Sequence, residues 1–126
     1  MNHAPGETTI EQHRAGLKAA IRILQAWGIE GPDQARILNI DQALVDAPET
    51  LDTTDQSQLT TISYLLNIHA SLKELFQNPE NHSGFMMSIN QNPPYYGQRP
   101  LDFVLTGKLE AIKEVFESLE LLKYGQ

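Results

Sequence analysis

The stretch "QSQLTTISYLLNIHASLKELF", residues Gln56–Phe76, has the pattern of one long helix. Apolar side chains recur in it at spacings of three and four, which places them on one helical face. They are Leu59, Ile62, Leu65, Leu66, Leu72 and Phe76. After "QNPENHSG", a turn in which Asn78 can cap and Pro79 can open a helix, we expect a further short helix toward Met87.

The segment before this helix predicts three more helices. The first carries apolar residues at helical spacing, has Thr8 and Glu11 at the spacing of a capping box, and stops at Gly28. These apolar residues are Leu17, Ala20, Ile21, Ile23, Leu24 and Trp27. A short second helix begins near Pro32, and a short third helix lies between Asp41 and Pro48.

The segment after the long helix predicts a loop and two more helices. "SINQNPPYYGQR", residues 88–99, resists regular assignment because Pro93 and Pro94 can neither extend a helix nor donate to a sheet. Pro100 then starts a short helix closed by Gly107, and residues 108–124 form an amphipathic one. Its apolar residues are Leu109, Ile112, Val115, Phe116, Leu119 and Leu122.

No convincing strand is found, so the fold class is all-α: a compact helical domain of about seven helices. Residues 1–7 read as a flexible tail. Residues 8–55 have the helix, tight turn and helix pattern of a degenerate helix-turn-helix, and residues 56–126 form a second helical region. We expect these two regions to pack as one unit, because 126 residues make one domain of ordinary size.

Charge argues against nucleic acid as the partner of the isolated chain. The net charge is -7, and between Glu30 and Leu59 seven acidic residues face one base, Arg36. Affinity for DNA comes largely from Lys and Arg that neutralise phosphates. The second helix of the helix-turn-helix pattern, Asp41–Asp46, would bring carboxylates rather than basic side chains to a groove.

One basic stripe keeps a DNA-binding alternative open. Arg14, Lys18 and Arg22 are spaced by four and share one face of the first helix. That face could contact phosphates, or it could be the solvated side opposite the apolar residues. A transcriptional autorepressor of its own operon is therefore the alternative function.

Several classes of site and compartment are disfavoured. The chain has no cysteine, which fits a reducing compartment such as the cytoplasm. No apolar run approaches the roughly 20 residues of a membrane span, and "MNHAPGETT" lacks the features of a leader.

The four histidines are scattered, without the paired spacing of a zinc site, and no serine lies in a nucleophile elbow. We expect no catalytic residues, no metal and no cofactor, and hence not an enzyme.

The loop itself favours binding to another protein. Tyr95, Tyr96 and Arg99 lie close together in "PYYGQRPLDF", residues 94–103. Tyrosine and arginine are enriched at the residues that dominate binding energy in protein interfaces. Loops stiffened by proline also lose less entropy on docking.

The second half resembles a known family. The "LLNIHASLKELF" helix, the "FQNPEN" turn, an aromatic-led short helix ending at Asn90, and a glycine, a basic residue and "PLD" lie in order within residues 59–119. This run is similar to the toxin-binding domain of Xre/MbcA/ParS antitoxins. Upstream, "WGIEGPDQARILNI", residues 27–40, resembles the degenerate helix-turn-helix before that domain, so the resemblance covers about residues 16–120.

The resemblance implies an antitoxin of a type II toxin-antitoxin system that occludes the cleft of a RES-domain toxin, an enzyme that consumes NAD. Phe85, Asn90, Gly97, Arg99, Pro100 and Leu101 match the family pattern, whereas Met87, Ser88 and Gln98 replace basic residues of many members. The candidate toxin-binding residues are Phe85, Met87, Asn90, Tyr95, Tyr96, Gly97, Gln98, Arg99 and Pro100.

Two further expectations concern assembly. Leu44 and Val45 lie on a short acidic helix with little else to pack on, so we expect a homodimer through the first half of the chain. If no toxin accompanies the protein, the remaining alternative is an orphan protein-interaction module.

Overall fold

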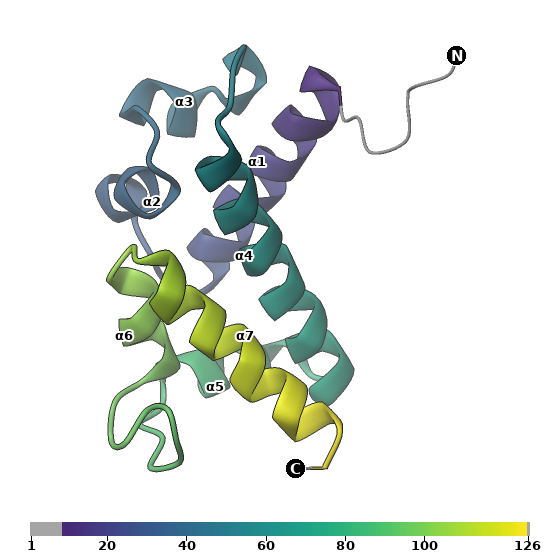
Figure 1. Cartoon of the computed structure of the whole chain (residues 1–126), viewed down its shortest axis with the longest axis vertical. Helices are drawn as coiled ribbons and strands as arrows, with labels where there is room; N and C mark the ends of the chain where they lie inside the picture. The colour runs from purple at the N-terminus through teal and green to yellow at the C-terminus, as the bar shows by residue number, and fades with distance from the viewer. Residues whose placement is uncertain (1–8, 126) are drawn as a thin grey trace.

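The computed structural model describes residues 9–125. This part of the chain forms seven α-helices, one 3-10 helix and no strand, which confirms the all-α prediction (Figure 1). The elements are α1 (Ile10–Ala26), α2 (Gly31–Leu38), α3 (Gln42–Asp46), η1 (Pro48–Thr50), α4 (Gln56–Leu75), α5 (Pro79–Met87), α6 (Pro100–Leu105) and α7 (Leu109–Lys123). The expected tail, residues 1–7, and Thr8 lie outside the described residues.

The first helix begins one residue later than its sequence pattern predicted. The capping box is formed by Thr9 and Gln12, whose side chains each accept a hydrogen bond from the other residue's backbone N–H, at 3.1 and 2.9 Å. A glutamine three residues after the cap can close this pair as well as a glutamate can, which is why the assignment to Thr8 and Glu11 was wrong. The predicted stop is confirmed, since Gly28 follows the helix with φ +84°.

The two short helices after α1 are confirmed with their turn. Pro32 lies in the first turn of α2, and Asn39 ends that helix in the left-handed region with φ 56°. Asp41 precedes α3 but its side chain makes no capping hydrogen bond, and α3 has only five residues. Pro48 begins η1, and Leu51 after it is buried.

Helix α4 is the centre of the fold, because α1 packs on one of its sides and α7 on another (Figure 1). Ile62, Leu65 and Leu72 are buried as predicted, whereas Leu59, Leu66 and Phe76 are only half-buried. Ile68, outside the predicted face, has no exposed surface. With two partner helices the buried arc of α4 is wider than one stripe.

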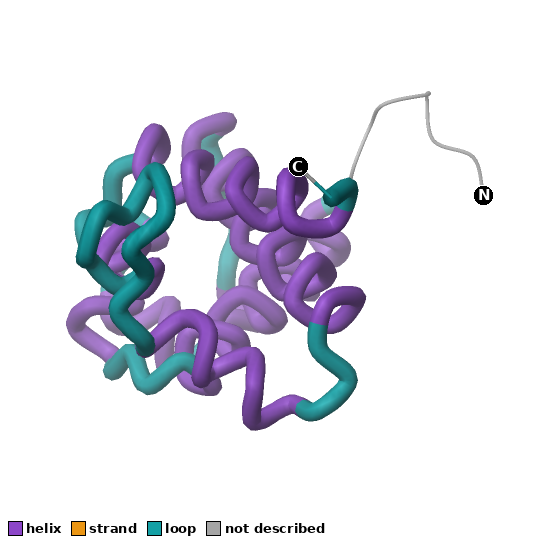
Figure 2. The backbone as a smooth tube through the Cα atoms, turned by 90° about the horizontal axis from the view of Figure 1, so that it is seen from below, coloured by secondary structure: helices purple, strands orange, loops and turns teal. Residues whose placement is uncertain are grey.

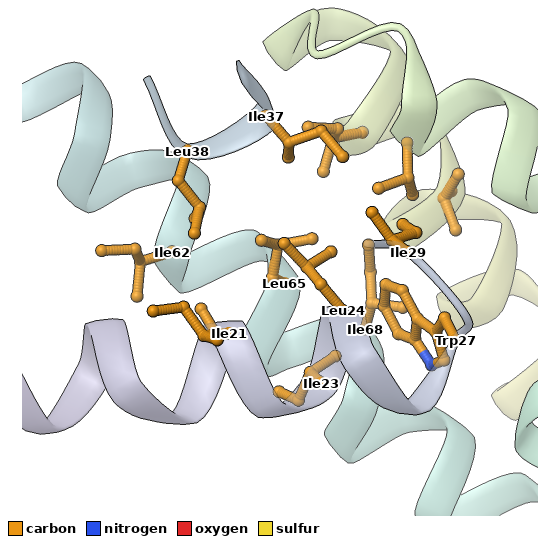
Figure 3. Packing of buried hydrophobic residues seen from close by; sticks show 14 of the residues in the cluster. Ile21, Ile23, Leu24, Trp27, Ile29, Ile37, Leu38, Ile62, Leu65 and Ile68 are labelled. Carbon is orange, nitrogen blue, oxygen red and sulfur yellow. The ribbon is translucent and has the colours of Figure 1, made fainter. Parts of the chain in front are cut away.

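Both halves of the sequence contribute to one hydrophobic core. Among the described residues, eleven buried apolar side chains precede Gln56 and eleven follow it, so neither half encloses a core of its own. Figure 3 shows Leu24 and Trp27 of the first half beside Leu65 and Ile68 of α4.

The last helix departs from its predicted apolar face at one residue. Ile112, Val115 and Leu119 have no exposed surface, but Leu122 is 48 % exposed. In the last turn Lys123 lies one helical turn after Leu119, and its ammonium reaches Glu74 of α4 at 3.5 Å. Lys123 thus occupies the side next to α4, and Leu122 turns outward.

Among the described residues, no helix combines the length and the apolar character needed to cross a membrane.

Two of the segments that connect the helices lie at opposite ends of the molecule. The irregular loop at residues 88–99, between α5 and α6, and the end of α7 both lie at the lower end of the molecule in Figure 1, which Figure 2 shows from below. The links around α3 and η1 lie at the opposite end.

Candidate functional site

The loop at residues 88–99 is closed by its own backbone hydrogen bonds. Asn90 and Gln98 form an isolated antiparallel bridge, in which the Asn90 N–H donates to the Gln98 carbonyl at 3.0 Å. The Gly97 N–H donates to the Asn90 carbonyl at 2.8 Å. At the tip, the N–H groups of Tyr95 and Tyr96 donate to the Asn92 carbonyl, at 2.9 and 3.2 Å. The loop is therefore an ordered turn rather than a slack connection.

Tyr95 anchors this loop in the core. Its side chain is 1 % exposed, its ring meets the ring of Phe103 edge to face at 5.1 Å between centroids, and its hydroxyl forms a hydrogen bond with Ser118 of α7. Burial raises the pKa of Tyr95 to about 12, with the negative charge of Glu114 adding to the rise and the Ser118 hydrogen bond opposing it. A neutral, hydrogen-bonded phenol therefore ties the loop to α7.

Tyr96, the next residue, points the other way. It is 74 % exposed, and its backbone has φ +46°, a left-handed conformation that residues other than glycine rarely adopt. Gly97 follows with φ +96°. Strained backbone of this kind clusters at binding sites, where the surrounding structure holds it in place. The loop thus buries one tyrosine and presents its neighbour.

Arg99 is tied to the start of α6 rather than lying free. Its Nε and Nη2 donate to Oδ1 of Asp102, at 3.1 and 2.6 Å, and its backbone N–H donates to Oδ2 at 3.0 Å. These hydrogen bonds lower the pKa of the Asp102 carboxyl and raise that of Arg99. The Arg99 side chain keeps 37 % of its surface exposed and, with Met87, lines a cleft of about 430 Å³ beside Trp27.

The structure divides the nine predicted toxin-binding residues into three groups. Met87, Tyr96 and Gln98 are exposed, and Phe85, Asn90, Gly97 and Arg99 are half-buried. Tyr95 and Pro100 are buried, so their side chains pack mainly inside the protein. For Tyr95 the reason is the pocket between α6 and α7, and for Pro100 it is the first turn of α6.

Exposed apolar side chains gather at the end of the molecule that carries this loop. The large hydrophobic residues that are exposed, among those described, come only from the segment around the loop and from the end of α7. We call this set the apolar end: Met87, Ile89, Tyr96, Leu121, Leu122 and Tyr124. The candidate residues chosen from the sequence did not include Ile89, Leu121 or Tyr124.

A cleft of about 370 Å³ lies between the loop and the end of α7. One wall comes from the loop and α5, with Phe85 and Pro93, and the other from α7, with Leu121 and Leu122. Tyr95 and Ser118 also line it. The cleft has the size of one or two large side chains, and its lining is mainly apolar.

The three residues proposed for DNA binding differ in their surroundings. The Arg14 Nε donates to the Leu51 carbonyl at 2.6 Å, whereas Lys18 and Arg22 remain exposed.

The homodimer was expected because Leu44 and Val45 had little to pack on in their own chain. That reason is wrong, because Val45 is buried and Leu44 packs against the core of its own chain.

The histidines do not assemble a metal site in the described part of the chain. His69 and His82 lie close, with ring centroids 6.0 Å apart, and burial, Lys73 and His82 lower the pKa of His69. Within residues 9–125, no three or more histidine, cysteine or acidic side chains lie together so that they could hold a metal ion.

No protein-family model and no curated protein matches this chain.

Proposed function

We propose that this protein is an antitoxin that binds one partner enzyme stoichiometrically and covers its active site with the apolar end. The observation that carries the proposal is that, within residues 9–125, the exposed large apolar side chains all lie at that end. Water penalises such exposure, and exposed apolar side chains gathered at one end of a protein are typical of a site where another macromolecule binds. The partner in this proposal is a NAD-consuming toxin with a RES domain, as the resemblance of residues 59–119 implies.

The order of the loop supports a role in occlusion. A segment held by Tyr95 and by its own backbone hydrogen bonds pays little conformational entropy when it docks. Tyr96 offers an aromatic side chain for a pocket in the partner, which is the kind of contact that dominates interface energies. A non-enzymatic role in the cytoplasm belongs to the same proposal.

The test is inhibition of a RES-domain protein encoded in an adjacent reading frame. Purified antitoxin should abolish its NAD hydrolysis at one equivalent, and Tyr96→Ala should weaken inhibition by about thirtyfold or more, as an interface hot spot would. Glu49→Ala, on exposed η1 at the opposite end, is the matched control and should inhibit like the unaltered protein. If the double variant with Tyr96→Ala and Met87→Ala still inhibits the toxin fully, the apolar end does not cover the toxin's active site.

A further inference from the structure

Helix α7 presents a stripe of exposed side chains along one of its faces. Residues at positions i, i+4, i+7, i+11 and i+14 lie on one face of a helix. In α7 and the residue after it these positions are Glu110, Glu114, Glu117, Leu121 and Tyr124, and each is exposed. The stripe is therefore acidic along two turns and apolar at its end.

The three glutamates of this stripe are separate from the ionic network of the core side. Glu120 faces α4, where it accepts a hydrogen bond from Ser71 at 3.2 Å and pairs with Lys123 at 2.7 Å. Within residues 9–125 no ion pair reaches Glu110, Glu114 or Glu117. Three exposed carboxylates thus lie in a row, and none of them forms an ion pair with the described part of the chain.

The stripe meets the cleft at Leu121. Leu121 belongs to both, and the negative charge of Glu114 contributes to the raised pKa of Tyr95, which lines the cleft. From Glu110 to Tyr124 the stripe extends about 21 Å at 1.5 Å per residue. A second helix of about four turns would match that length side by side.

We infer that the cleft and the α7 stripe together dock one basic amphipathic helix of the partner protein. A large apolar side chain of that helix fills the cleft between Pro93 and Leu121, and its Lys or Arg residues face Glu114 and Glu117. The inference rests on the proposed function, because it assigns the chemistry of the segment that binds at the apolar end.

Charge selects this occupant over the others that an apolar groove could hold. Nucleic acid and anionic lipid surfaces are repelled by the glutamates and by the net charge of -7. A second copy of this chain, paired in parallel through the same stripe, would set glutamates against glutamates. A helix with positive charges beside apolar residues complements both parts of the surface.

The probe is a synthetic helical peptide of 18 residues. It carries two leucines and three lysines on one face at the spacing of the stripe, with alanine and glutamine elsewhere. The control peptide has the same composition with its lysines on the opposite face. We expect the first peptide to shift the amide resonances of residues 88–97 and 114–122, and the control to bind at least about fivefold more weakly, since it loses the paired charges.

Charge reversal then tests the glutamates. Glu114→Lys together with Glu117→Lys should weaken peptide binding by about tenfold, as two exposed pairs turn from attraction to repulsion. Asp46→Lys together with Glu49→Lys makes the same change of charge at the other end and should alter binding less than about twofold. Leu121→Ala, which removes exposed side chain and leaves the core intact, should weaken binding without changing thermal unfolding.

Three results would overturn the inference: shifts centred on the acidic α2–α3 region, equal binding of both peptides, or unchanged affinity after reversal of Glu114 and Glu117. Failure of the proposed function has a different signature. In that case the peptide binds as described while the RES-domain protein is not inhibited at all. If the toxin is inhibited, and Tyr96→Ala relieves inhibition while the glutamate reversal does not, the docking helix is wrong and the antitoxin function stands.

Discussion

The hydrogen bond between Tyr95 and Ser118 should hold the loop to α7 with a measurable and asymmetric energy. In Tyr95→Phe the ring remains against Phe103, and Ser118 still donates to the Val115 carbonyl at 2.8 Å. Only the shared hydrogen bond is lost, so we expect unfolding to become easier by about 1 kcal/mol. For a chain of this size that lowers the melting temperature by about 4 °C.

Removing the other partner of this hydrogen bond, with Ser118→Ala, should lower the free energy of unfolding by more. In Ser118→Ala the hydroxyl of Tyr95, a residue only 1 % exposed, loses its partner, and an unpaired buried hydroxyl costs about 1 to 3 kcal/mol. The greater helix propensity of alanine offsets about 0.5 kcal/mol of that. In the double variant no polar group is left unpaired, so its loss of stability should lie near that of Tyr95→Phe alone. The two effects are then non-additive by about 1 kcal/mol or more.

Urea unfolding provides the assay. Trp27 is the chain's single tryptophan and is 1 % exposed, so its fluorescence reports global unfolding, with circular dichroism as the second probe. Tyr96→Phe is the control and should change stability by less than about 0.5 kcal/mol, since Tyr96 is 74 % exposed. Additive effects of the two single variants, or equal costs for Tyr95→Phe and Tyr96→Phe, would refute the reasoning.

Four further results are expected. Tyr96→Ala should lower toxin affinity alone, whereas Arg99→Ala should lower affinity and melting temperature together because it releases Asp102; calorimetry and thermal unfolding separate the two. Gly97→Ala should destabilise by about 1 to 2 kcal/mol at φ +96°, while Gly84→Ala inside α5, where an added methyl meets nothing, should stabilise by about 0.5 to 1 kcal/mol in urea melts. Because the folded pKa of Tyr95 is raised to about 12, the stability from its neutral form is complete below about pH 10 and lost as pH rises toward 12, a loss that Tyr95→Phe should lack when urea midpoints are compared. The isolated protein should bind its promoter more weakly than about 10⁻⁸ M at physiological salt, and a gel-shift titration showing tighter specific binding would contradict this.

The helices of this protein could be predicted because their signals are local. Pro32, Pro79 and Pro100 open helices, and Gly28 and Gly107 follow helix ends with positive φ, so each boundary depends on a few adjacent residues. Periodicity likewise placed the buried faces of α1 and most of those of α4 and α7. These features require no knowledge of what packs against each helix.

Part of the candidate site was also readable from the sequence. The prolines and Gly97 marked residues 88–99 as an irregular loop, and two tyrosines with an arginine marked it as unusual. The pattern could not tell Tyr95 from Tyr96, since neighbours of the same type carry the same local signal. It also gave no indication of Asp102 as the partner that holds Arg99.

What only the tertiary structure decided is which apolar side chains find a partner helix. Ile68 is buried because α4 is covered by two helices, while Leu122 is exposed because Lys123 takes the side of α7 next to α4. Tyr95 is buried because Phe103 and Ser118 meet it from two other elements. Burial depends on surfaces that are distant in sequence, whereas capping and periodicity depend on neighbours, and the apolar end with its cleft arises only where the loop and α7 are brought together.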